Sequence, residues 1–131
     1  SGNRSTTRLR YHIVLSFKYR KNVARVIGED SVKSLLESAV GKCSGVKLHA
    51  IGIDKNHVHI VVSCSPYWSP SSLIGRIKQL STHRAWDKYG GELSTVYYKK
   101  KRMLWSDGFF CETIGNVSED KVLDYVKNQG C

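Results

Sequence analysis

The sequence lacks the features of membrane, secreted and repetitive proteins. No apolar run approaches the roughly 20 residues with which a helix crosses a bilayer, and no signal-peptide pattern opens the chain. Only two prolines are present, and no internal repeat or low-complexity tract marks a linker. We therefore expect neither a membrane protein nor a small secreted protein, and we expect no domain boundary.

Cysteine is sparse as well, and its spacing is that of neither a zinc site nor a disulfide framework. The four cysteines are Cys43, Cys64, Cys111 and Cys131, and no two of them form a CxxC pair. This usage predicts an intracellular protein whose thiols are mostly buried or idle. An incidental disulfide is left open by the sequence.

Negative charge is scarce relative to positive charge. The chain has 21 Lys+Arg against 11 Asp+Glu, a formal net charge of +10. Such an excess on a small domain is typical of a protein that binds a polyanion, although charge that serves only solubility is the alternative.

With 131 residues, of which 40% are hydrophobic, the chain is long enough for one domain with its own core. We predict a single domain over 1–131, with a basic arm of uncertain order at 1–9.

The pattern of apolar residues and turn residues predicts the element order β-α-β-β-α-β-α. We expect strands at 10–19, 47–53, 57–63 and 109–114. We expect one helix that begins within 28–31, a second from Ser69-Pro70 to Gly90-Gly91, and a third over 118–129. The first six elements correspond to an α+β, ferredoxin-like split β-α-β (RRM-like) fold. Such a fold has one antiparallel sheet with two helices on one face, and here a C-terminal helix is added.

The sharpest local motif is the pair His57 and His59 within the apolar run HVHIVV. Residues i and i+2 of a strand point to the same face, so the two imidazoles lie side by side while the intervening residues enter the core. Two converging imidazoles can bind a metal ion. Two solvent-facing histidines on an exposed strand are the alternative.

The last predicted helix places Tyr125 and Gln129 four residues apart, on one side of the helix and next to its packed face. A tyrosine at that border packs its ring against protein and extends its hydroxyl outward. Taken singly, Tyr125 is better explained as a packing residue, and Gln129 as a solvated residue near the chain end.

In combination, these motifs resemble the single-tyrosine HUH transposases of small bacterial and archaeal insertion sequences, the insertion-sequence 200-like family. The resemblance covers nearly the whole chain in collinear order: YHIVLSFKYRK, IGIDKNHVHIVV, SPSSLIGRIKQLSTHRAW, MLWSDGFFCETIG and VLDYVKNQ. It implies a cytoplasmic, prokaryotic enzyme, a metal-dependent endonuclease and strand transferase. The resemblance assigns no function to the basic segment 94–102.

The resemblance implies that Tyr125 attacks a DNA phosphate and forms a 5′-phosphotyrosine intermediate. It also implies that His57, His59 and Gln129 hold a divalent metal ion, Mg²⁺ or Mn²⁺, which fits their neutral nitrogen and oxygen donors. Rejoining then needs no ATP, and the sequence contains no nucleotide-binding P-loop.

The carboxylates are too dispersed to predict a three-carboxylate metal cluster. Asp54 is expected to serve in a turn or to orient one of the paired histidines. Glu112, His12 and His49 are reserve candidates either for a metal ligand or for that supporting role, and the preferred alternative is that each is an ordinary strand residue.

The resemblance implies that the partner is single-stranded DNA with imperfect hairpins. Basic and aromatic residues would contact the phosphates and bases of such a strand. The aromatic candidates are Tyr97, Tyr98 and Trp105. The basic candidates are Arg8, Arg10, Arg76, Lys78, Arg84, Lys99, Lys100, Lys101 and Arg102.

The family also implies a homodimer whose active sites are shared between subunits. Two alternatives remain open at this point. One is a non-catalytic module that binds single-stranded nucleic acid, and the other is a domesticated relative that processes chromosomal hairpins.

Overall fold

The computed structural model describes residues 8–115 and 123–128. Its elements are β1 (Leu9–Ser16), the 3-10 turn η2 (Lys18–Arg20), α1 (Val23–Ile27), α2 (Glu29–Gly41), β2 (Lys47–Asp54), β3 (His57–Cys64), α3 (Pro70–Leu93) and β4 (Phe110–Thr113). Residues 123–128 are helical as well.

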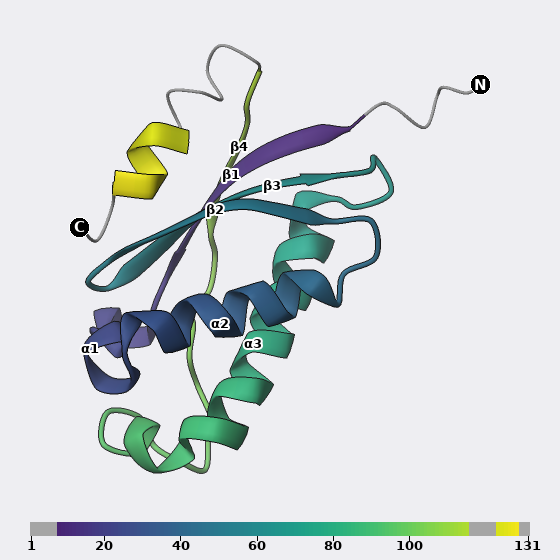
Figure 1. The fold of residues 1–131 in the computed structure, drawn as a ribbon. Coiled ribbons are helices and arrows are strands. Elements are labelled where there is room, and N and C mark those ends of the chain that lie inside the picture. Colours follow the sequence, from purple (N-terminus) through teal and green to yellow (C-terminus); the bar gives the residue numbers. More distant parts are fainter. Residues whose placement is uncertain (1–7, 116–122, 129–131) are drawn as a thin grey trace.

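The four strands form one antiparallel sheet in the order β2-β3-β1-β4. Helices α2 and α3 pack on one face of this sheet, and the helical segment 123–128 lies on the opposite side (Figure 1). The strand order and the two covering helices confirm the predicted ferredoxin-like α+β fold with an added C-terminal helix.

Side chains alternate along the central strands, as the sequence predicts. In β3, Val58, Ile60 and Val62 are buried in the core between sheet and helices. In β1, Ile13 and Leu15 join them there. The residues between these positions therefore point to the other side of the sheet, which we call the open face.

The two covering helices follow their predicted apolar faces. In α2, Val32, Leu35, Leu36 and Ala39 are all buried. Helix α3 begins where the sequence indicates: the Ser69 hydroxyl accepts from the Ser72 amide, and the Ser72 hydroxyl lies 3.1 Å from the Ser69 amide nitrogen.

Two boundaries differ from the expectation, and one short helix was not expected. The first strand ends at Ser16 rather than at residue 19, because Tyr19 and Arg20 adopt the left-handed conformation, with φ of 56° and 52°. Helix α3 continues past the glycine pair to Leu93, with a local distortion at Tyr89. The sequence analysis also missed the short helix α1, which Asn22 caps by accepting from the Arg25 amide.

Parts of two predictions lie outside the described residues. The expected last helix, 118–129, is helical over 123–128, whereas its beginning and Gln129 fall outside the described ranges. Most of the expected basic arm, residues 1–7, does so as well, and Leu9 already belongs to β1.

The described cysteines behave as predicted. Cys43, Cys64 and Cys111 are free thiols, and Cys131 lies outside the described residues. Burial raises the pKa of each of the three thiols, that of Cys111 to about 11. Thiolate chemistry is therefore disfavoured at these positions.

None of the helices among the described residues has the length and apolar character needed to cross a membrane.

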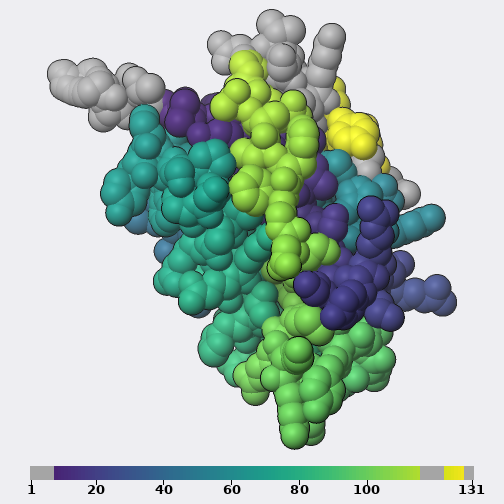
Figure 2. All heavy atoms as spheres, turned by 180° about the vertical axis from the view of Figure 1, so that it is seen from behind, coloured from purple at the N-terminus to yellow at the C-terminus, as the bar shows by residue number. Residues whose placement is uncertain are grey.

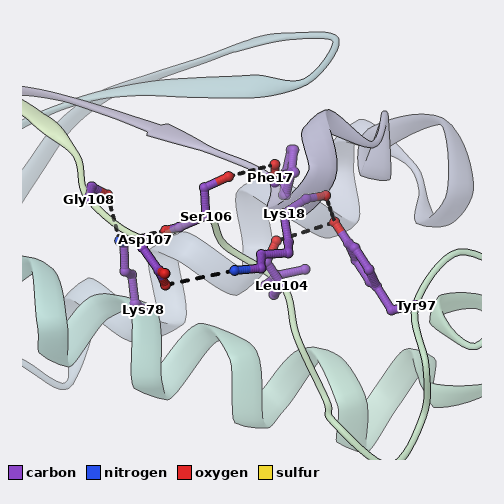
Figure 3. A network of polar contacts seen from close by, with 8 residues as sticks. All are labelled: Phe17, Lys18, Lys78, Tyr97, Leu104, Ser106, Asp107 and Gly108. Carbon is purple, nitrogen blue, oxygen red and sulfur yellow. Dashed lines mark hydrogen bonds and ion pairs between the residues drawn. The ribbon is translucent and has the colours of Figure 1, made fainter.

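A long connector, residues 94–109, leads from α3 to β4 along the surface seen in Figure 2. Polar contacts attach it to α3 and to the end of β1 (Figure 3). The Lys78 ammonium donates to the carbonyls of Ser106 at 2.9 Å and Gly108 at 2.7 Å. The Ser106 hydroxyl donates to the Phe17 carbonyl at 3.0 Å. These contacts fix the direction in which the chain enters β4, next to β1.

A buried hydrogen bond also anchors the connector. The Trp105 ring stacks on Phe17, with ring centroids 4.6 Å apart. Its indole N–H donates to the Ser81 hydroxyl at 2.8 Å, and Ser81 in turn donates to the Ile77 carbonyl on α3. Because Ser81 is fully buried, no water can replace its hydroxyl as the acceptor for Trp105.

We predict that Ser81→Ala lowers the free energy of unfolding by about 1–3 kcal/mol, because the buried indole N–H loses its acceptor. Urea denaturation followed by circular dichroism measures this change. Ser94→Ala is the matched control, since the Ser94 hydroxyl also donates to a helix carbonyl but is exposed. Equal, small losses in both variants would contradict the anchoring role.

Candidate active site on the open face of the sheet

The paired histidines lie where the strand period places them. His57 and His59 both project from β3 onto the open face, with ring centroids 5.0 Å apart. On the neighbouring strand, the residue opposite His59 is Gly52. Strand β2 therefore contributes no side chain at that position.

His57 lies at the turn of the β2–β3 hairpin, and its ring is held by the turn itself. The Asn56 side-chain oxygen accepts from His57 Nδ1–H at 2.8 Å. The other ring nitrogen, Nε2, lies 3.6 Å from Asp54 Oδ2. Asp54 pairs with His57 across the two strands, so the hairpin register brings this carboxylate to the histidine.

His59 belongs to a chain of side chains that crosses three strands. Its Nδ1 is 3.0 Å from Nε2 of His12 on β1, and the two rings stack with centroids 5.2 Å apart. His12 Nδ1 is 2.8 Å from Oε2 of Glu112 on β4. The register explains the contacts: Glu112 is directly opposite His12, whereas His59 is its diagonal neighbour, two residues from the directly opposite Val61.

The surroundings of His59 keep its ring neutral. Burial, followed by the nearby rings of His12 and His57, lowers the pKa of His59 to about 4, while Asp54 acts in the opposite direction. The neutral ring carries one proton, and one nitrogen remains available as a lone-pair donor. Its Nε2 is buried and has no hydrogen-bond partner among the described residues.

The helical segment 123–128 brings Tyr125 to this histidine. Val126 is fully buried in a small apolar cluster with Val61 of β3 and Ala50 of β2. This contact fixes the side of the helix that faces the sheet. Tyr125 then lies edge-on to His59 of the same chain, with ring centroids 5.3 Å apart, and remains about half exposed at 52%. Gln129 lies outside the described residues.

The donor set near Tyr125 fits a divalent metal ion in part. Among the described residues, no group of three or more His, Cys, Asp or Glu side chains could hold a metal ion. His57 and His59 supply two neutral imidazoles, and a buried ring nitrogen without a partner is uncommon in folded proteins. A cation at His59 Nε2 would provide that missing partner, with further ligands from outside this residue set.

Comparison with known proteins identifies the family. The sequence model of the family described as "Transposase IS200 like" matches residues 5–129, nearly the whole chain. This chain belongs to that family. The resemblance inferred from the motifs is thereby confirmed, and the protein is a transposase by family.

Individual relatives agree with this assignment. The transposase for insertion sequence element IS200 from Salmonella typhimurium is 28% identical over 120 residues, covering 92% of this chain and 76% of the relative. The ISDra2 transposase TnpA from Deinococcus radiodurans is 22% identical over 123 residues, covering 92% of this chain and 84% of the relative.

Two solved structures share the fold. One is described as a putative transposase from Deinococcus radiodurans, with a TM-score of 0.73 at 20% identity, covering 98% of this chain and 96% of that chain. The other is a REP-associated tyrosine transposase bound to a REP hairpin, with a TM-score of 0.62 at 13% identity, covering 96% and 69%.

The transposase brings together most of the residues expected to support the histidine pair. Asp54 lies near His57, and Glu112 reaches His59 through His12. His49 is placed differently: its ring hydrogen-bonds the Ser63 hydroxyl at 2.9 Å, four residues along β3 from His59. The sequence analysis missed Asn56, although its position beside His57 in a tight turn was a usable signal.

The basic residues proposed for DNA contact fall into two groups. Arg8 and Lys78 are already engaged with the protein: Arg8 donates to the Gly45 and Ser63 carbonyls, and Lys78 donates to the connector. Burial lowers the pKa of Lys78. The other candidates lie on β1, on α3 and in the connector: Arg10, Arg76, Arg84, Lys99, Lys100, Lys101 and Arg102. Of these, Arg76 also donates to the Gln79 side-chain oxygen at 3.1 Å.

Two of the aromatic candidates are core residues. Tyr97 is buried, and its hydroxyl donates to the Lys18 carbonyl at 2.8 Å. Trp105 is buried against Phe17. The expectation that these two rings stack with bases is therefore wrong, because the connector uses them to pack onto the domain. Tyr98 remains exposed at 60%.

Proposed function

We propose that this transposase cleaves and rejoins single-stranded DNA at hairpin-bearing element ends, with Tyr125 as the nucleophile. The observation that supports this most directly is the position of the Tyr125 ring against His59 on the open face. The likeness in fold to a tyrosine transposase bound to a REP hairpin agrees with a hairpin partner.

His57, His59 and Gln129 would hold a divalent cation, Mg²⁺ or Mn²⁺. When bound, such an ion acts as a Lewis acid that withdraws charge from the phosphoryl oxygens and orients the phosphorus. The protein's part is to direct one ring nitrogen of each imidazole to a common place on the open face. Asn56 does this for His57 by accepting a hydrogen bond from its Nδ1–H, which leaves the lone pair of the neutral ring on Nε2.

In the cleavage step, the Tyr125 oxygen forms a bond to phosphorus and the bond from phosphorus to the 3′ oxygen breaks. The phenol loses its proton, and the departing oxygen gains one to become a free 3′-hydroxyl. The 5′ side of the break remains attached as a phosphotyrosine. Attack by a 3′-hydroxyl reverses these events and rejoins the strand, so the link itself conserves the bond energy and no ATP is needed.

We predict that the protein, incubated with a hairpin-bearing single-stranded oligonucleotide and Mn²⁺, forms a covalent adduct that survives SDS. Tyr125→Phe should abolish the adduct, because the phenyl ring keeps the packing but lacks the attacking oxygen. Denaturing gel electrophoresis of labelled DNA measures it. Tyr67→Phe is the matched control, since Tyr67 is the more exposed ring, at 86%, and lies outside the site.

An adduct that persists in Tyr125→Phe would reject this nucleophile. DNA binding that is indifferent to a chelator and to His57→Ala, with no adduct in any variant, would instead identify a non-catalytic single-strand binding module. A domesticated relative gives the same adduct as an active transposase. Only the presence or absence of flanking element ends in the genome distinguishes those two.

Backbone contacts from the connector should make DNA binding depend on salt. Each phosphate contacted on a single strand contributes ~0.7 to the slope of log affinity against log salt. We predict that replacing Lys99, Lys100 and Lys101 together by Ala lowers this slope by up to about 2. Fluorescence anisotropy at several salt concentrations measures it. Lys42→Ala, at the exposed end of α2, serves as the control and should leave the slope unchanged.

The protein is further proposed to act as a homodimer whose sites are shared between subunits. In the single chain, Tyr125 contacts its own His59. The cluster of Val126, Val61 and Ala50 could form equally well with the helix of a second copy, because exchange of an identical element preserves every contact.

Mixed dimers test this arrangement. Tyr125→Phe chains combined with His57→Ala/His59→Ala chains should recover part of the cleavage that each lacks alone, because one composite site then has both functional parts. Gel assays on dimers whose mixed composition is verified by differential tagging measure the recovery. No recovery would favour the contact within one chain.

A further inference from the structure

A hydrogen-bonded chain behind the histidine pair has no part in the function proposed above. It runs from Glu112 Oε2 to His12 Nδ1 over 2.8 Å, and from His12 Nε2 to His59 Nδ1 over 3.0 Å. His12 is 7% exposed and His59 is 6% exposed, so the hydrogen bond between the two rings is buried, whereas the one between His12 and Glu112 is partly buried. The side chain of Glu112 is 45% exposed.

The carboxylate of Glu112 determines which ring nitrogens donate and which accept along this chain of hydrogen bonds. An ionised carboxylate only accepts hydrogen bonds, so Glu112 requires the proton of a neutral His12 ring to be on Nδ1. His12 Nε2 is then an acceptor, and it requires the proton of His59 to be on Nδ1. The lone pair of His59 is thereby assigned to Nε2, the buried ring nitrogen that has no partner among the described residues.

We propose that Glu112 and His12 are positioning residues that fix His59 as the Nδ1–H tautomer and so present its Nε2 lone pair to the divalent cation. This inference rests on the proposed function for its cation. The tautomer itself is a property of the metal-free protein. The arrangement extends a familiar pattern, in which a carboxylate orients a metal-binding histidine directly, by placing a second imidazole between the two.

The alternative arrangement of the ring protons makes an equally specific prediction for His59. If His12 carried protons on both nitrogens, it would donate to Glu112 and to His59 at once. His59 Nδ1 would then be an acceptor, and the His59 proton would occupy Nε2, where it would block metal binding. The position of one proton therefore separates the two arrangements.

Long-range ¹H–¹⁵N correlation spectra of the metal-free protein at neutral pH locate that proton, because protonated and unprotonated ring nitrogens resonate far apart. We expect wild-type His59 to be protonated at Nδ1. In Glu112→Ala, His12 loses the acceptor that fixes its own tautomer, so His59 should populate both forms. Glu92→Ala is the control, since it removes an exposed carboxylate from α3, and it should leave the His59 signals unchanged.

A His59 proton on Nε2 in the wild type would overturn the proposal, and so would a His59 tautomer that is unaffected in both Glu112→Ala and His12→Phe. Glu112→Ala keeps the test decisive if His12→Phe fails to fold, because Glu112 lies on the short edge strand with its side chain partly in solvent.

Titration with Mn²⁺, followed by the electron paramagnetic resonance signal of the free ion, supplies the second measurement. Glu112→Ala should bind Mn²⁺ about 10–100-fold more weakly than the wild type, which is the usual effect of removing a group that orients a ligand. Unchanged affinity in that variant would overturn the positioning role. If the wild type binds no Mn²⁺, the metal in the proposed function fails, whereas the spectra still decide the tautomer.

Discussion

The alternation of side chains along β3 is the constraint on which the site depends. Val58, Ile60 and Val62 point into the core beneath the sheet, and the register that buries them there is the one that places His57 and His59 together on the open face. A slip of one residue would place both imidazoles among the core side chains and expose Val58 and Ile60 to solvent. The free energy that stabilises the core therefore also holds the histidine pair in place, with no separate scaffold.

The parts of the fold that depend on local periodicity could be predicted from the sequence. The buried face of α2 and the start of α3 at Ser69 follow directly from residue spacing and capping chemistry. The end of the first strand could not be predicted, because Tyr19 takes a left-handed conformation that the sequence gives no reason to expect of a tyrosine. The burial of Tyr97 and Trp105 could not be predicted either, because it depends on how the connector packs back onto the domain.

The candidate site likewise contains one part that the sequence could predict and one part that it could not. The pairing of His57 with His59 is set by two residues within one strand, so the motif alone indicates it. The contact of His12 with His59 joins positions 47 residues apart, and that of His12 with Glu112 joins positions 100 residues apart. Both depend on which strands become neighbours and in which register. The sequence could therefore propose Glu112 and His12 only as unranked candidates, whereas the sheet order β2-β3-β1-β4 gives each of them a definite partner.

The small apolar contact between the helical segment 123–128 and the sheet affects how easily this segment can separate from the rest of the domain. Among the described residues, it is held to the sheet by Val126 and Leu123 against three small or medium apolar side chains, Ala50, Val61 and Ile114. Local opening that separates such a segment from the sheet costs less free energy than unfolding of the whole domain. Such an opening would move Tyr125 away from His59 and leave the core between the sheet and the two covering helices intact.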